Sequence, residues 1–171
     1  MHHMAVRSDP PTKGSSFVRI VIATDLTESS LDAALYGIRR ARLVDASVTV
    51  AHVVGSTDID TRDAISYRYQ RRREEPDAKS VVEELVEAKT NEVRAWFEET
   101  VGDASDLDIT YAIEFGDLPD VIWHIVKEVN ADSIVVGVHG RHGVGRHVSR
   151  ILLDATIPVV VVRQGIYQAD S

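Results

Sequence analysis

The chain has 171 residues and a formal net charge of −8, with 44% hydrophobic residues, 27% charged residues and no cysteine. This size and composition are typical of one globular domain with a buried core. Without cysteine there can be no disulfide, thiol catalysis or cysteine-ligated metal. No segment approaches the ~20 apolar residues of a membrane span, no secretory signal is visible, and the negative charge disfavours general nucleic-acid binding. We therefore expect a cytoplasmic protein that contacts neither membrane nor nucleic acid.

The two ends of the chain are predicted to lie outside the domain. Residues 1–16 are polar and hold the histidines of a possible tag, which is typical of a flexible leader or tag remnant. We predict the domain over residues 17–165 and a tail over residues 166–171.

The first half of the domain begins with an apolar, β-branched run over residues 17–23, which predicts a buried strand. Thr27 or Ser29 can cap the helix that follows. Its apolar positions keep helical spacing at Leu31, Ala34, Leu35, Ile38 and Ala41. A second strand is predicted over residues 47–54, and helical spacing returns between residues 82 and 97.

Between these elements, residues 55–77 are polar and irregular, and they contain the basic run Tyr67–Arg73. The run could contact phosphate or RNA. It could also be a solvated helical face, balanced by Glu74 and Glu75, and charge runs on surface helices favour this second interpretation.

The second half of the domain continues the alternation of strand and helix. Residues 109–115 place apolar side chains at every second position, as in a strand. Residues 118–129 carry the clearest helical stripe of the chain. Two more strands are predicted over residues 133–138 and 158–163, with a last helix between them whose apolar positions are Val148, Ile151, Leu152 and Ala155.

Such an alternation predicts an α/β fold, a three-layer sandwich in which helices cover both faces of a five-stranded parallel sheet. The strands at residues 17–23, 133–138 and 158–163 are almost continuously apolar, which is typical of central parallel strands.

Ligands of open parallel sheets bind beyond the carboxyl ends of the strands, where the strand order reverses. If the first and fourth strands are neighbours, Asp25 faces the glycine-rich turn of residues 137–146 across one crevice. Glycines let backbone amides approach a phosphate, a helix starting near Val144 would add its dipole, and Arg141 and Arg146 could add charge. The alternative is that these glycines serve only the geometry of the turn.

Asp25 also has two possible roles. It could bind a ribose hydroxyl or a magnesium ion, or it could cap the first helix. The hydroxyls of Thr27, Ser29 and Ser30 are already available as caps, which favours the ligand role.

The histidines do not form a convincing metal site. His139, His142 and His147 lie close in sequence, but structural zinc needs about four convergent ligands. His52 and His124 are interpreted as partly buried, hydrogen-bonded residues. No G-x-S-x-G elbow, H-E-x-x-H pair or P-loop is present, so we expect no enzyme.

The chain nevertheless resembles the universal stress protein family. The similar segments follow in the family's order over residues 17–163: Ile20–Asp25 with the Leu-Thr-Glu-Ser-Ser after it, Ala51–Val54, Glu114–Asp117, Ala131–Gly140 and Ile157–Arg163. The resemblance implies the strand order 3-2-1-4-5 and a homodimer through the last strand, Pro158 to Arg163. Some members of the family bind ATP and others do not.

In the members that bind nucleotide, the aspartate after the first strand corresponds to Asp25. A second-strand position beside adenine corresponds to Val53, and the residue before the first loop glycine corresponds to Val136. Together with the residues of the crevice, the candidate nucleotide-binding set is Ala23, Thr24, Asp25, Val53, Val136, Gly137, His139, Gly140, Arg141, Gly143, Gly145 and Arg146.

The phosphate loop departs from the family pattern. Gly137 and Gly140 are present, but the long spacer and the closing Gly-Ser/Thr are not. Either Gly145 matches the later glycine, with Arg146 in place of the hydroxyl residue, or a deletion follows Arg141–Arg146. Fewer amides can then reach a triphosphate, and arginine could compensate through planar contacts with phosphate.

The residues and the resemblance together leave three candidate functions. The first is a stress-response regulatory domain that binds ATP, AMP or another adenine nucleotide, with Mg²⁺. The second is a dimeric interaction module for an unidentified protein partner, without nucleotide. The third, slow nucleotide hydrolysis, is the least favoured because no general base or metal cage is apparent.

Overall fold

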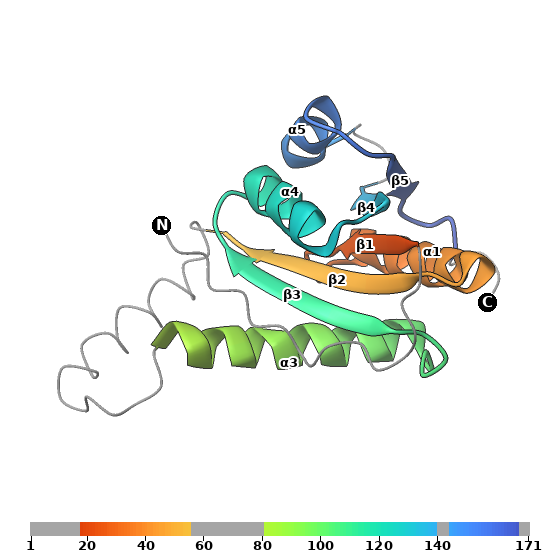
Figure 1. Cartoon of the computed structure of the whole chain (residues 1–171), viewed down its shortest axis with the longest axis horizontal. Coiled ribbons are helices and arrows are strands. Elements are labelled where there is room, and N and C mark those ends of the chain that lie inside the picture. Colours follow the sequence, from red (N-terminus) through yellow and green to blue (C-terminus); the bar gives the residue numbers. More distant parts are fainter. Residues whose placement is uncertain (1–17, 56–80, 140–143, 168–171) are drawn as a thin grey trace.

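A computed structural model describes residues 18–55, 81–139 and 144–167. Strands and helices alternate through these ranges (Figure 1), which confirms the predicted α/β class. The leader, the polar stretch after Gly55 with its basic run, and the last four residues lie outside the described residues. The elements are β1 (Arg19–Ala23), α1 (Glu28–Val44), β2 (Ser47–Val54), α3 (Val81–Val101), β3 (Ile109–Phe115), α4 (Leu118–Val129), β4 (Ser133–Val138), α5 (Arg146–Leu153) and β5 (Val159–Arg163).

The five strands form one parallel sheet in the order β3-β2-β1-β4-β5. This order is the one that the resemblance implied. β1 lies at the centre, and its last residue, Ala23, pairs with Val136 of β4. The first and fourth strands are therefore neighbours, and the point where the strand order reverses lies between their carboxyl ends.

Helices cover both faces of the sheet: α1 and α3 lie on one face, and α4 and α5 on the other (Figure 1). Successive residues of a strand point to opposite faces, so Ile22 enters the core under α1 and α3 while Val21 enters the core under α4 and α5. Both side chains are fully closed to solvent. Within the described part of the chain, no helix is long and apolar enough to cross a membrane.

The strand predicted over residues 158–163 is not central, although its sequence is almost continuously apolar. β5 pairs with β4 on one side only, and among the described residues no strand pairs with its outer side. Val159, Val160 and Val161 remain half-buried. Helices cover its two faces in part, which accounts for the apolar pattern, while its hydrogen-bonding edge stays open.

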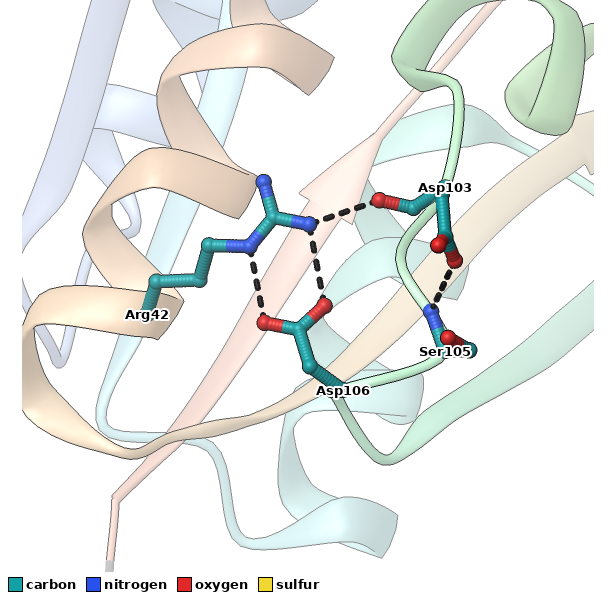
Figure 2. Close-up of polar contacts among 4 residues, drawn as sticks. All are labelled: Arg42, Asp103, Ser105 and Asp106. Atoms are coloured by element: carbon teal, nitrogen blue, oxygen red, sulfur yellow. Dashed lines mark hydrogen bonds and ion pairs between the residues drawn. The ribbon is translucent and has the colours of Figure 1, made fainter.

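The loop between α3 and β3 is tied to the C-terminal turn of α1 by an ion pair (Figure 2). Nε and Nη2 of Arg42 each donate a hydrogen bond of 2.9 Å to the Asp106 carboxylate, and Nη2 also donates to the carbonyl of Asp103 at 2.7 Å. The hydrogen bond with Asp106 raises the pKa of Arg42. Because both side chains are exposed, such a pair contributes little to stability and is weakened by salt. It lies at the end of the sheet opposite the carboxyl ends of the strands.

The segment after β5 is fixed to α1 by a fully buried carboxylate. Asp32 has no exposed surface, and it accepts hydrogen bonds from the backbone N–H groups of Gly165, at 2.6 Å, and Tyr167, at 2.9 Å. The Tyr167 ring then lies against Tyr36 and under the guanidinium of Arg39. Asp32 therefore joins the edge strand to the first helix.

Replacing this carboxylate should cost stability. We expect Asp32→Ala to lower the free energy of unfolding by about 2–3 kcal/mol, because two backbone donors lose a charged acceptor. Asp32→Asn retains one carbonyl oxygen and should lie between the two proteins. Urea denaturation measures the change, with Asp154→Ala at an exposed position as the control, for which a change within about 0.5 kcal/mol is expected. Equal stability of Asp32→Ala and the control would contradict the role given to Asp32.

Candidate functional site

A cavity of about 370 Å³ opens at the carboxyl ends of β1, β2 and β4, a volume within the range of small-molecule sites. Its walls come from five parts of the fold: the end of β1 with the start of α1, the end of β2, one face of α4, the end of β4, and the first turns of α5. The lining residues are Ala23, Thr24, Asp25, Ser29, Ser30, Ala51, Val53, Leu118, Ile122, Val136, Gly137, Val138, His139, Gly145, Arg146, His147, Val148 and Ile151.

The cavity collects the described members of the predicted nucleotide-binding set: Ala23, Thr24, Asp25, Val53, Val136, Gly137, His139, Gly145 and Arg146. The other three members, Gly140, Arg141 and Gly143, lie outside the described residues. Sequence reasoning missed the wall formed by Leu118 and Ile122 of α4 and by Val148 and Ile151 of α5. These residues belong to recognised apolar stripes, but a stripe does not show which of its members border a cavity.

Asp25 organises the turn that precedes α1. Its Oδ1 accepts hydrogen bonds from the backbone N–H of Thr27, at 3.0 Å, from the Thr27 hydroxyl and from the Ser30 hydroxyl, at 2.6 Å. Thr27 is the N-cap of α1, but its side chain makes no capping hydrogen bond. Thr27 thus occupies the predicted N-cap position, but its hydroxyl is bonded to Asp25 and does not cap the helix, and Ser29, the alternative, lies inside α1.

The same hydrogen bonds keep Asp25 ionised. Partial burial opposes the charge, but the hydrogen bonds from Ser30 and Thr27 outweigh it and lower the pKa of Asp25. All three bonds use Oδ1, and no donor among the described residues is bonded to Oδ2. The two roles weighed for Asp25 are thus compatible: one oxygen holds the turn, and the other can serve a ligand.

The backbone around Asp25 is fixed from both sides. The Thr24 hydroxyl accepts a hydrogen bond from the N–H of Leu26 at 3.0 Å, and Leu26 has a φ of 64°, which is uncommon for a residue other than glycine. From the neighbouring strand β2, Nδ1 of His52 donates a hydrogen bond to the Thr24 carbonyl at 2.9 Å. Burial lowers the pKa of His52, which favours the neutral ring. His52 is thus partly buried and hydrogen-bonded, as predicted.

Gly137 is required by the packing of the fold. A Cβ at this position would overlap the carbonyl oxygen of Ser29 and lie 2.6 Å from its carbonyl carbon. The first turn of α1 therefore rests directly on the end of β4. At Gly145 a Cβ would meet none of the described atoms within 4 Å. Of the two roles weighed for the glycines, Gly137 fits the geometric one, while Gly145 leaves open space beside the cavity.

The N-terminus of α5 forms the positively charged side of the cavity. The helix begins at Arg146, near the position predicted, with Gly145 as an N-cap that has no side chain to satisfy the first amides. Arg146 and His147 are exposed and line the cavity. First-turn amides and the helix dipole favour an anion at this place.

His139 lines the cavity between this helix and α1. Its Nδ1 lies 3.4 Å from Oε1 of Gln164, whose Nε2 donates a hydrogen bond of 2.9 Å to Glu28. These contacts connect His139, through Gln164, to the start of α1. The wall of the cavity is thereby connected to the segment after β5.

The described side chains around the cavity include polar and apolar groups, so they suit a ligand that has both polar groups and an apolar surface. Among the described residues, no group of three or more histidines or carboxylates could hold a metal ion. Of the histidines weighed as metal ligands, His142 lies outside the described residues. His124 is half-buried, with Nε2 3.9 Å from Oε2 of Glu114, on the face of β3 that α4 covers.

The two glycines provide a test of this geometry. We expect Gly137→Ala to lower the free energy of unfolding by at least about 2 kcal/mol, because a methyl group cannot fit against backbone atoms. Gly145→Ala should cost less than about 1 kcal/mol, the loss of a preferred N-cap residue. Urea denaturation of both variants measures the difference. Equal costs would show that the contact between α1 and β4 does not depend on glycine.

The comparisons with known proteins agree with this architecture. A family model described as the universal stress protein family matches residues 16–163. No curated protein sequence matches the chain. A solved universal stress protein in complex with cAMP has a TM-score of 0.57 at 19% identity, and the similarity covers 88% of this chain and 99% of that one.

Two further solved structures are similar in the same way. The universal stress protein from Archaeoglobus fulgidus in complex with dAMP gives a TM-score of 0.54 at 20% identity, covering 86% of this chain and 98% of that one. The universal stress protein UspA from Lactobacillus plantarum gives 0.55 at 18% identity, covering 88% and 100%. At such identities these likenesses concern the fold. With the family match over most of its length, the chain belongs to the universal stress protein family.

Proposed function

We propose that the cavity binds an adenine nucleotide and that the protein is a regulatory domain of the universal stress protein type. The observation that carries the proposal is the division of one cavity into three chemically different parts. It has apolar walls, a carboxylate on one side and the cationic start of a helix on the other. A base, a ribose and a phosphate match these parts in turn.

The apolar part suits the base. The apolar lining comes from Ala51 and Val53 of β2 and from Leu118 and Ile122 of α4, which covers this face of the sheet. Flat aromatic ligands are held mainly by such apolar surfaces, with a few polar groups that fix their orientation. Structural relatives of this chain have been solved with cAMP and dAMP, which supports an adenine nucleotide as the class of ligand.

The polar parts suit the ribose and the phosphate. Oδ2 of Asp25 is an ionised acceptor that a ribose hydroxyl can use, and hydrogen bonds to charged groups are the stronger ones. The first-turn amides of α5, with Arg146 and His147, suit phosphate oxygens. Because the described residues hold no metal cluster, Mg²⁺ would come with the phosphates of ATP and would not be needed for AMP.

Binding of nucleotide should depend on the open oxygen of Asp25. We expect Asp25→Asn to weaken AMP binding at least ~10-fold, the equivalent of one lost hydrogen bond to a charged group. The asparagine carbonyl can still hold the turn. Gly145→Val should also weaken binding, because it adds a branched side chain at a lining residue, next to the first-turn amides of α5. Isothermal titration with AMP, ADP and ATP, with and without Mg²⁺, measures both, with Asp154→Ala as the control.

The absence of any heat or thermal shift with millimolar nucleotide would contradict the proposal and favour the second function, an interaction module. If Asp25→Asn and Gly145→Val bound AMP like the parent protein, the nucleotide would bind elsewhere. Release of phosphate from ATP, followed in the same samples, separates slow hydrolysis from binding alone.

We also propose that the protein forms a homodimer through β5. This strand is at the edge of the sheet, its three consecutive valines are half-buried, and Leu152 and Leu153 nearby are exposed, Leu153 by 84%. Unprotected apolar edges tend to pair with another strand. A second copy of the chain presents the same edge, so the β5 strands of the two copies can pair with each other.

One substitution can block this edge without breaking the sheet. Pro158 and Gln164 direct their backbone groups toward β4, so by alternation Val161 directs its N–H outward. Proline is tolerated in an edge strand at such a position. We expect Val161→Pro to convert a dimer to a folded monomer in light scattering, whereas Val160→Pro should lose a hydrogen bond to β4 and unfold more readily. A parent protein that is monomeric over a wide concentration range would contradict the dimer.

A further inference from the structure

We propose that Arg150, which does not line the cavity, is a positioning residue for the phosphate of the ligand. Its ion pair with Asp117 holds α5 in the orientation that directs Gly145, Arg146 and His147 toward the cavity. This inference rests on the proposed nucleotide binding and adds a residue to it whose contribution is indirect.

The first observation is that α5 is weakly anchored by apolar packing. Of its eight residues only Ile151 is buried, with 1% of its surface exposed. The next two residues, Leu152 and Leu153, are 38% and 84% exposed. Only Val148, which is partly buried, packs beside Ile151 against the same core. A short helix whose apolar contacts are confined to two neighbouring positions keeps freedom to rotate about them.

The second observation is that Arg150 supplies another attachment. Its Nη1 donates a hydrogen bond of 2.9 Å to Oδ2 of Asp117, and its Nη2 lies 3.9 Å from Oδ1 of Asp120. Both carboxylates lie at the start of α4, where Asp117 is the N-cap. The ion pair of Arg150, added to the apolar contacts of Val148 and Ile151, fixes the direction of the helix axis more firmly than those contacts alone.

The third observation connects this ion pair to the cavity. α4 contributes Leu118 and Ile122 to the cavity wall, and α5 contributes Arg146 and His147. The ion pair thus joins the two helices that form this wall. Arg146 is four residues before Arg150, so both lie on the same side of the helix. A rotation of α5 would therefore move the cationic group and the first-turn amides away from the phosphate.

The role is specific to the phosphate. The surfaces proposed for the base and the ribose come from β2, α4 and the turn after β1, and we expect them to stay in place when the ion pair is lost. AMP binding should then depend on Arg150, whereas binding of adenosine, which has no phosphate, should not. Comparing these two ligands distinguishes positioning from a general loss of structure.

Asp117 distinguishes positioning from simple charge. Removal of Arg150 takes away a positive charge, which by itself weakens binding of an anion. Removal of Asp117 takes away a negative charge, which by itself strengthens it. If the pair acts by holding α5, both changes weaken AMP binding. The Asp117 side chain makes no capping hydrogen bond to α4, so its truncation leaves the start of that helix bonded as before.

The experiment measures AMP and adenosine affinity by titration for Arg150→Ala, Arg150→Lys, Asp117→Ala and the double variant. The pair is exposed, so we expect a loss of about 3- to 5-fold in AMP affinity for each alanine variant. The double variant should be no weaker than the single ones, and Arg150→Lys should recover part of the loss. Arg42→Ala breaks an ion pair of the same type at the other end of the sheet and should leave AMP affinity unchanged.

Hydrogen exchange of the α5 amides tests the positioning without any nucleotide. We expect faster exchange over Arg146–Leu153 in Arg150→Ala than in the parent protein or Arg42→Ala. Unchanged exchange would overturn the inference whatever the affinities are. So would tighter AMP binding by Asp117→Ala, or an equal loss of AMP and adenosine affinity. A parent protein that binds neither ligand would instead refute the proposed function, and the exchange result would still decide whether Arg150 holds α5.

Discussion

The contact between Gly137 and the backbone of Ser29 is the constraint on which the crevice depends. β1 and β4 are adjacent, and the chain that leaves β1 must turn directly into α1 above their ends. The absence of a side chain at Gly137 lets the first turn of that helix come down onto the end of β4. Ser29, Ser30 and the carboxylate of Asp25 reach the cavity because α1 begins so close to the sheet.

The same arrangement places opposite charges on opposite sides of the cavity. The turn before α1 carries an ionised carboxylate whose hydrogen bonds fix it in place. The start of α5, on the opposite side, carries the exposed guanidinium of Arg146 and first-turn amides that no side-chain cap satisfies. A ligand with a neutral polar end and an anionic end has one favourable orientation between them. The asymmetry comes from the order of the elements, since one helix follows β1 and the other follows β4.

The sequence predicted most of the fold because central parallel strands are buried on both faces and are therefore apolar throughout. The same rule failed for β5, where partial cover by helices on both faces gives an apolar strand at the edge of the sheet. The family resemblance, which uses the order of motifs along the chain, gave its position correctly. Glu114 could not have been predicted as buried, because alternation assigns polar residues to solvent, while α4 covers that face of β3.

The candidate site was predictable in part for a similar reason. Asp25 follows from its place at a strand end in the predicted topology, and Val136 follows from the family resemblance. Residues contributed by helix faces, such as Ile122 and Ile151, depend on how far each helix tilts over the sheet, which no periodicity encodes. The double use of Asp25, with one oxygen for the turn and one open to the cavity, depends on hydrogen-bond geometry that only coordinates provide.

The buried carboxylate of Asp32 has a consequence for where this folding unit ends. The family match stops at Arg163, with the last strand. Asp32, however, accepts two hydrogen bonds from backbone N–H groups beyond that residue. A chain shortened after Arg163 would keep every strand and yet lose both backbone donors of the Asp32 carboxylate. The short segment from Gln164 to Tyr167 belongs to no helix or strand, yet it is packed against α1, and its last two residues fall in the predicted tail of residues 166–171.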